Sequence, residues 1–363
     1  MKFVFYTNSI SPHQLPLARE LIKRIGEGNY RYIYTSPMTS ERKILGWNDA
    51  LEKWIVCEKD APKRCREWLE NCDVLMSGIR DFSLFEKRIA AGRKTIYSAE
   101  RWFKPIMVFG GAIGVSLPGW IRLVHPHYLR YAMRMARLIS DKSMFYCYPM
   151  GVWAKRDIEL ICRIFLVARN KYEQRIKVWG YFVEPSLTPR SQHLRKDSRS
   201  LQILWVGRLL RWKRVEDIVR AVKVCCLTGN KVTFDIYGFG PNEQCLKGLI
   251  AKLNLCDVVR LYPPVPVSDV RRLMCDHDVF VLASNACEGW GATVSEALVE
   301  GMRVVGTYEA GASATMLPSS NLYHAGDWKA LARILSDGVP LVSVGQWNVK
   351  VATDILLTEI GLT

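Results

Sequence analysis

The chain has 363 residues, of which 49% are hydrophobic, enough for two domains that each bury a core. Lys and Arg outnumber Asp and Glu by 51 to 35, so the formal net charge is +16 and an anionic partner is expected. No stretch of about 20 apolar residues occurs, which excludes a membrane-spanning helix, and Met1–Tyr6 lacks the pattern of a signal peptide. We therefore expect a cytoplasmic protein.

The cysteines do not form a recognisable metal or disulfide pattern. There are 11 of them, without a C-x-x-C pair and without a histidine cluster at zinc spacing. Several lie in apolar runs, as Cys225 and Cys226 do, which is typical of buried thiols in a reducing compartment. We expect no metal site and no cofactor.

The first half of the chain opens with a strand, a loop and a helix, as a doubly wound α/β domain does. The strand is expected at Lys2–Tyr6 and the helix at His13–Gly26, where apolar residues recur at helical spacing. Further strands are expected at Arg31–Tyr34, Asp73–Gly78 and Lys94–Ser98.

A helix with a basic face is expected from Tyr128 onward. Arg130, Arg134 and Arg137 follow one another at helical spacing on one side. Such a helix is typical of a membrane-surface element, but an ordinary helix with a solvated basic face explains the pattern equally well. Each basic residue near an anionic leaflet adds about 1 kcal/mol, so three alone predict weak binding.

The domain boundary is expected after the strand-like run Lys177–Phe182. The sequence that follows contains Pro185 and Pro189 between Ser, Arg and Lys residues, as linkers do. The expected segments are an N-terminal domain, a linker, a C-terminal domain and a terminal helix that crosses back to the first domain, at 1–182, 183–200, 201–345 and 346–363.

The second half alternates strands and helices, which predicts a second parallel sheet. Strands are expected at Leu201–Val206, Val232–Tyr237, Val258–Tyr262, Val279–Ala283 and around Val304 and Val305. Helices are expected at Val215–Leu227, Glu243–Leu253, Val267–Cys275, Thr293–Glu300, Lys329–Leu335 and Trp347–Leu357. Gly306–Ala314 is expected to be a loop.

The turn Asn285–Ala292 must lie at the carboxyl end of a strand, where parallel sheets bind ligands. Its glycines, Gly289 and Gly291, allow main-chain N–H groups to come close to a ligand. The helix that starts near Thr293 directs its positive end to the same place, which suits a phosphate.

Two carboxylates frame this turn, Glu288 and Glu296, with seven residues between them. Carboxylates repel phosphate, so they are better placed to accept hydrogen bonds from hydroxyl groups. A ligand with phosphates in the middle and hydroxyls on either side fits, and a nucleotide sugar is such a molecule. The stretch from Glu288 to Leu298 resembles the E-x7-E motif of retaining glycosyltransferases of the GT-B fold, family 4. An ordinary turn with solvated glutamates is the alternative, and Gly301 just past the helix favours the motif.

A second element also resembles this family. Gly207 and Arg208 follow a strand, and with Lys213 they are similar to its G-R-x4-K element. The resemblance implies that the two cations bind the donor diphosphate, where they stabilise the charge of the leaving group. Arg211 and Arg214 match no position of the family and are expected at the surface.

The resemblance implies a GT-B fold, with two Rossmann-like doubly wound domains facing across a cleft. The implied reaction moves a sugar from a nucleoside diphosphate sugar to an acceptor hydroxyl with retention, without a metal ion, in cell-surface polysaccharide biosynthesis. The implied catalytic residues are Arg208, Lys213 and Glu288, of which Glu288 holds the sugar hydroxyls. The implied donor-binding residues are Gly207, Gly238, Gly289, Trp290, Gly291, Ala292, Thr293 and Glu296.

The acceptor side departs from the family. The first loop has no glycine, and its polar residues Asn8, Ser9 and His13 are candidates to face the cleft. A surface position at the start of the helix is an equal alternative for His13. Where many relatives have a histidine after a later strand, this chain has Glu100 and Arg101. Glu100 is a candidate acceptor contact or base, and equally a charge at a helix N-terminus. The implied acceptor is a glycan or lipid-linked glycan, which would bring the protein to the inner face of the cell membrane.

Two alternatives stay open at this point. One is another GT-B enzyme, such as a nucleotide-sugar epimerase. The other is a non-catalytic partner that binds nucleotide sugars. Nucleic acid is not an expected partner, because no DNA- or RNA-binding signature accompanies the positive charge.

Overall fold

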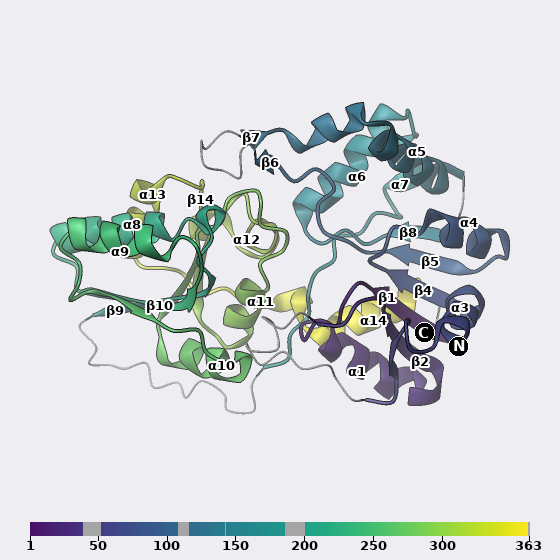
Figure 1. Cartoon of the computed structure of the whole chain (residues 1–363), viewed down its shortest axis with the longest axis horizontal. Helices are drawn as coiled ribbons and strands as arrows, with labels where there is room; N and C mark the ends of the chain where they lie inside the picture. Colours follow the sequence, from purple (N-terminus) through teal and green to yellow (C-terminus); the bar gives the residue numbers. More distant parts are fainter. Residues whose placement is uncertain (39–51, 108–115, 142, 186–199, 362–363) are drawn as a thin grey trace. The chain divides into compact units, whose positions relative to one another are not determined.

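The computed structural model describes residues 1–38, 52–107, 116–141, 143–185 and 200–361. The chain divides into two compact units, each with its own sheet and helices (Figure 1). The described residues up to Phe182 and those from Gln346 onward form the first unit, and the described residues between Val183 and Gly345 form the second. Most of the predicted linker, 183–200, lies outside the described residues.

The first unit contains a sheet of six parallel strands in the order β3-β2-β1-β4-β5-β8. The strands are β1 (Phe3–Thr7), β2 (Tyr30–Tyr34), β3 (Ile55–Cys57), β4 (Val74–Ser77), β5 (Lys94–Tyr97) and β8 (Phe145–Cys147). Phe3 of β1 lies opposite Tyr30 on one side and Val74 on the other. Because the strand order reverses between β1 and β4, a ligand crevice is expected at the carboxyl ends of these two strands.

Helices and two short strands complete this unit. The helices are α1 (Leu15–Ile25), α3 (Pro62–Asn71), α4 (Phe82–Ala90), α5 (Pro126–Asp141), α6 (Val152–Ile164), α7 (Arg169–Tyr172) and α14 (Val349–Glu359), and the 3-10 turn before α5 is η3 (Gly119–Val124). β6 (Ile106–Met107) and β7 (Ser116–Leu117) pair as antiparallel strands. The side chain of Asp81 caps α4 by accepting a bond of 2.9 Å from the N–H of Leu84.

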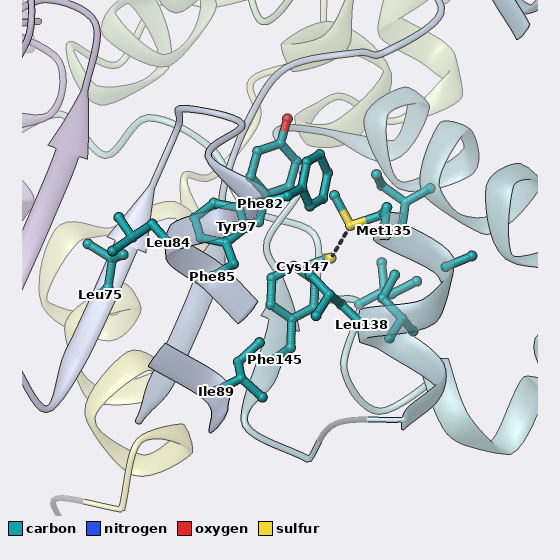
Figure 2. Close-up of a cluster of buried hydrophobic side chains, with 14 of the residues drawn as sticks. Leu75, Phe82, Leu84, Phe85, Ile89, Tyr97, Met135, Leu138, Phe145 and Cys147 are labelled. Atoms are coloured by element: carbon teal, nitrogen blue, oxygen red, sulfur yellow. Dashed lines mark hydrogen bonds between the residues drawn. The ribbon is translucent and has the colours of Figure 1, made fainter. Parts of the chain in front are cut away.

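The core of the first unit joins the sheet to α4 and α5. Figure 2 shows Phe85 of α4 and Met135 of α5 around Phe145 and Cys147 of β8. All four side chains are fully or almost fully buried. The apolar stripe of α5 therefore faces the core of its own unit.

The end of the chain returns to the first unit through α14, which packs against α1. Asp354 of α14 forms an ion pair of 3.0 Å with Arg24 of α1. The main-chain oxygen of Glu359 accepts a bond of 3.2 Å from Lys94, and its carboxylate pairs with Lys177.

The second unit repeats the architecture, with six parallel strands in the order β11-β10-β9-β12-β13-β14. The strands are β9 (Leu201–Arg208), β10 (Val232–Phe239), β11 (Val259–Tyr262), β12 (Val279–Leu282), β13 (Arg303–Thr307) and β14 (Leu322–Tyr323). The helices are α8 (Val215–Leu227), α9 (Glu243–Lys252), α10 (Val267–Asp276), α11 (Ala292–Val299), α12 (Gly311–Met316) and α13 (Trp328–Asp337).

One polar cluster links β10 and β11 to the end of α10. The Asp235 carboxylate accepts bonds of 2.7 Å from Arg260 and of 3.1 Å from His277. The other ring nitrogen of His277 lies 2.8 Å from the carbonyl oxygen of Leu273. Burial alone would raise the pKa of Asp235, but the hydrogen bonds from His277 and Arg260 hold it below its ordinary value.

The predicted fold class, two doubly wound α/β domains, is confirmed, while several details were wrong. Lys177–Phe182 is not a strand, since only isolated bridges at Ile176 and Trp179 occur there. The expected loop Gly306–Ala314 contains the end of β13 and the start of α12. The three-residue strands β3 and β8 were not predicted.

Six of the 11 cysteines are buried, and Cys245 and Cys256 are exposed. All 11 lie in the described part of the chain, and none forms a disulfide bond. Burial raises the pKa of Cys65 and of Cys72 to about 11, so both stay protonated at neutral pH. Of the helices described, none has the length and apolarity needed to cross a membrane.

Candidate active site

The second sheet has a switch point between β9 and β12, its two central strands. From β9 the strand order runs outward to β10 and β11, and from β12 it runs the other way to β13 and β14. The main-chain N–H of Asn285, after β12, donates a 2.9 Å bond to the carbonyl of Trp212, after β9. The loops that follow these two strands therefore meet at the edge where parallel sheets bind ligands.

An ion pair joins the two loops, between Lys213 after β9 and Glu288 after β12. Their side chains are only 18% and 11% exposed. The hydroxyl of Ser284 donates a second bond to the same carboxylate, at 2.8 Å. The ammonium group of Lys213 also lies 4.6 Å from the ring centre of Trp212. Because each charge is held by a partner, the pair is fixed in position while it is largely shielded from water.

Glycines allow main-chain segments to approach one another around this pair. A Cβ at Gly238 would lie 1.9 Å from the carbonyl oxygen of Gly207. Gly291 has a φ of +88°, which side chains with a Cβ rarely adopt. A Cβ at Gly311 would lie 2.2 Å from the carbonyl oxygen of Gly289. Gly238, Gly291 and Gly311 must therefore stay glycine for the site to keep its shape.

The helix α11 begins directly after Gly291, and no side chain caps its N-terminus. Its first residues, Ala292 and Thr293, therefore offer main-chain N–H groups next to the Glu288 turn. Glu296 lies on the second turn of α11 and is 4% exposed. The side chain of Trp290 is fully buried and donates to Ser295 at 3.1 Å, so only its main chain is available to a ligand.

The arginines near Lys213 have different surroundings. Arg208 ends β9, and its side chain is exposed, as is that of Arg211. Arg214 is half-buried and pairs with the buried carboxylate of Asp217 at 2.6 Å. The expected surface position therefore fits Arg211, while Arg214 has a structural partner.

The acceptor-side candidates all belong to the first unit. Asn8 is exposed after β1, and its carbonyl accepts a 2.8 Å bond from Ser36. Ser9 is half-buried beside it, and the ring of His13 lies 5.7 Å from that of Tyr181. They lie near the switch point between β1 and β4.

Glu100 and Arg101 follow β5 in the same unit, and both have partners. Glu100 forms an ion pair of 2.7 Å with Lys104, and a third of its side chain is exposed. Arg101 lies 3.5 Å from the buried carboxylate of Asp157. Asp157 also accepts a 2.9 Å bond from the main-chain N–H of Phe103. Arg101 is therefore held by Asp157, a residue of the same unit.

The second unit matches a known protein family in sequence. Residues 189–337 match the model described as Glycosyl transferases group 1. The match covers the part of the chain that carries all six strands of the second sheet.

Two curated relatives match parts of this chain. The amylovoran biosynthesis glycosyltransferase AmsK of Erwinia amylovora is 29% identical over 164 residues, 41% of this chain and 40% of its own length. The GtfA subunit of a UDP-N-acetylglucosamine–peptide N-acetylglucosaminyltransferase of Streptococcus agalactiae is 30% identical over 110 residues, 30% of this chain and 21% of its own. The matches therefore span less than half of these relatives.

Solved glycosyltransferase structures share the fold over nearly the whole of this chain. Anabaena HepE in complex with UDP has a TM-score of 0.62 at 15% identity and covers 99% of this chain and 95% of its own. The lipopolysaccharide outer core galactosyltransferase WaaB has a TM-score of 0.66 at 15% identity and covers 99% of both. At this identity the likeness shows the GT-B fold alone.

Two residues with side-chain contacts near the candidate site residues were not predicted from the sequence. Ser284 is fully buried, and its bond to Glu288 was not predicted, although a serine at the end of an apolar strand was a signal. Arg80 follows β4, where its Nε donates to the hydroxyl of Tyr97 at 3.1 Å. Its guanidinium lies 4.4 Å from the ring centre of Trp102. No spacing in the sequence indicated this arrangement.

Proposed function

We propose that this chain transfers a sugar from a nucleoside diphosphate sugar to an acceptor hydroxyl, with retention of the anomeric configuration. The observation that carries the proposal is the contact between Lys213 and Glu288 at the switch point of the group 1 segment. It puts a cation suited to a diphosphate beside a carboxylate suited to hydroxyl groups. The HepE structures, described in complex with UDP and with UDP-glucose, favour a UDP-sugar as the first donor to test.

In this proposal, Lys213 and the exposed Arg208 bind the donor diphosphate and stabilise the charge that builds up as it departs. Main-chain N–H groups between Gly289 and Thr293 add donors to the phosphate and the sugar. Glu288 accepts bonds from the sugar hydroxyls, and Glu296 accepts from the ribose. The two cations take the part that a metal ion would otherwise play.

Retention requires the acceptor to attack from the face that the diphosphate leaves. The departing phosphate oxygen is therefore proposed to take the proton of the acceptor hydroxyl, so that no separate base is needed. The bond between the anomeric carbon and the phosphate oxygen breaks, and the acceptor oxygen forms the new glycosidic bond on the same face of the sugar. The departing phosphate carries away the proton of the acceptor hydroxyl.

For the acceptor we propose a glycan of a cell-surface polysaccharide, bound in the cytoplasm. The name of AmsK supports this class, because AmsK matches more of the chain than the peptide-directed relative does. The acceptor would meet the first unit at the carboxyl ends of β1, β4 and β5, where Asn8, Ser9, His13, Glu100 and Arg101 lie. Arg80 is added to this set, since Trp102 and Tyr97 hold its guanidinium in one orientation.

A thermal-shift experiment tests the donor site without knowledge of the acceptor. The protein is melted with UDP, GDP, dTDP or ADP, and a ligand at 100 times its dissociation constant adds about 2.7 kcal/mol of stability. Lys213→Ala is expected to abolish the shift, whereas Arg211→Ala, two residues away and exposed, is expected to keep it. An equal shift in both variants would remove Lys213 from the site.

Product analysis separates the proposed transferase from the two alternatives. Free nucleoside diphosphate formed only with a glycan acceptor present supports transfer. Conversion of one nucleotide sugar into another without acceptor would instead indicate an epimerase. Binding without turnover of either kind would indicate a non-catalytic partner.

A further inference from the structure

The first unit exposes an unusual number of apolar side chains from the end of β7 through η3 to α5. Among the described residues, 6 of the 14 exposed large hydrophobic side chains fall between Leu117 and Met133. Val124 is 80% exposed and Trp120 is 56% exposed. We name these six residues the apolar shelf: Leu117, Trp120, Ile121, Val124, Leu129 and Met133. Such a concentration in water requires a partner or a surface that covers it.

The shelf is held in place by the main chain beneath it. A Cβ at Gly119 would lie 2.2 Å from the carbonyl oxygen of Phe103, so η3 rests directly on this backbone. Arg122 donates from η3 to the carbonyl of Lys104. Phe103 itself is buried in the core of the unit. The exposed side chains of η3 are therefore presented by a fixed turn.

The helix α5 continues the shelf on its outer side. Its buried side chains include Met135 and Leu138, which face the core in Figure 2. Leu129 and Met133 are one helical turn apart on the opposite side, where solvated polar residues are the rule. Packing within the unit therefore explains only one of the two apolar faces of α5.

The segment that carries the shelf holds charges of one sign. The sequence has no Asp or Glu between Arg101 and Ser140. Arg130 and Arg137 are exposed on the same side of α5 as Met133, and Arg137 lies 3.9 Å from Asp141. The third arginine of the predicted basic face, Arg134, is held by Glu86 at 2.6 Å. The basic face alone is thus weaker than the sequence suggested.

We propose that η3 and the outer side of α5 form a docking surface for an anionic membrane. Trp120, Ile121 and Val124 would insert between the headgroups, while Arg130 and Arg137 pair with acidic lipids. Tryptophan favours the membrane interface, and each arginine near an anionic leaflet adds to the binding. A plane of anionic headgroups fits a segment without Asp or Glu of its own between Arg101 and Ser140 better than a protein partner of mixed charge does. This inference goes beyond the transfer reaction and does not depend on it.

Vesicle sedimentation with the full-length protein tests the proposal. One set of vesicles contains phosphatidylcholine alone, and the other also contains phosphatidylglycerol. The protein is expected to bind the anionic set. Trp120→Ala with Val124→Ala is expected to lower the partition coefficient at least about tenfold. Arg130→Gln with Arg137→Gln should lower binding to anionic vesicles and reduce its dependence on salt.

A matched double variant provides the control. Val351 and Ile355 on α14 are 41% and 40% exposed, and changing both to Ala removes apolar surface away from the shelf. This variant should bind vesicles as the wild type does, and all variants should keep the wild-type melting temperature. Equal binding of the shelf and control variants would overturn the proposal, as would no binding of the wild type. Self-association that disappears in the shelf variant would assign the surface to a second copy of the chain instead.

Discussion

Gly311 is the position where one methyl group tests the arrangement of the candidate site most directly. A Cβ there lies 2.2 Å from the carbonyl oxygen of Gly289 and 3.3 Å from the Cα of Trp290. Both contacts are with main-chain atoms, which cannot rotate aside as a flexible side chain can. Gly311→Ala must therefore push α12 away from the turn that carries Glu288, and strain the 2.7 Å bond from the Ala312 N–H to the Trp290 carbonyl.

The cost follows from these contacts. Overpacking a buried position costs about 1–3 kcal/mol, and weakening one main-chain hydrogen bond adds about 1 kcal/mol. In a unit of this size each kcal/mol lowers the melting temperature by about 2–4 °C. We expect the transition of the second unit to fall by about 5–15 °C. The stabilisation by UDP should shrink too, because the displaced turn carries the proposed phosphate donors.

Gly248 offers a control with the same chemical change. It lies inside α9, and a Cβ there would meet nothing within 4 Å. Replacing a glycine by alanine inside a helix stabilises by about 0.5–1 kcal/mol, so Gly248→Ala should raise the melting temperature. Differential scanning calorimetry of the two variants gives shifts of opposite sign if the close approach is real. A Gly311→Ala protein that melts with the wild type would refute the reasoning.

Three further predictions rest on single contacts. Ser284→Ala removes a hydrogen bond to the Glu288 carboxylate, and hydrogen bonds to charged groups are worth about 1.5–3 kcal/mol. Sugar transfer should therefore fall at least about tenfold while the fold persists. An unchanged rate of nucleoside diphosphate release would contradict this prediction. Because the folded-state pKa of Asp235 is lowered, its contribution to stability is complete above the unfolded pKa of about 3.9 and is lost as pH falls through the lower folded value. Between pH 7 and acid pH, the melting temperature of Asp235→Asn should therefore fall less than that of the wild type. Timed thiol labelling should modify the two exposed cysteines, Cys245 and Cys256, before the buried ones, and rapid labelling of the buried ones would contradict the burial.

The second unit could be predicted well because its local signals agree with its packing. The helix α8 lies at Val215–Leu227, the predicted range. β12 is a continuous apolar run, as is typical of strands buried on both faces. The predicted strands ended before Gly207 and Gly238, yet β9 and β10 continue through both, because the two strands pair there. Pairing between distant segments decides where a strand ends, and one segment does not reveal it.

The first unit was harder, for the same reason. β3 and β8 have three residues each, too few to show a period, and only their parallel neighbours define them as strands. The run Lys177–Phe182 has a strand-like composition, but its bonds to the chain beyond β8 amount to isolated bridges. Propensity describes a segment, whereas a sheet edge is set by the partner that is available.

In the candidate site, too, the sequence predicted the positions of residues but not the contacts between their side chains. Motif positions indicated Lys213 and Glu288 separately, and the switch-point rule placed both at one edge of the sheet. Their direct contact joins residues 75 positions apart and could not be predicted from spacing. The stack of Arg80 on Trp102 depends on the relative placement of the turns after β4 and β5. A basic residue after a strand has no sequence feature that separates this arrangement from a solvated side chain.

Substitution of Glu288 tests whether its carboxylate binds the donor sugar or only pairs with Lys213. In the proposed reaction the donor diphosphate replaces Glu288 as the partner of Lys213, and the Glu288 carboxylate accepts hydrogen bonds from the sugar hydroxyls. Glu288→Gln removes a negative charge close to the phosphate, so UDP should bind about three- to tenfold more tightly. Sugar transfer should nevertheless fall, because an amide is a weaker acceptor for hydroxyl groups than a carboxylate. Calorimetric titration with UDP and the rate of nucleoside diphosphate release would measure the two effects. A purely structural ion-pair partner predicts that binding and turnover change together, so opposite signs in the two measurements would assign Glu288 to the sugar, and parallel losses would assign it to holding Lys213.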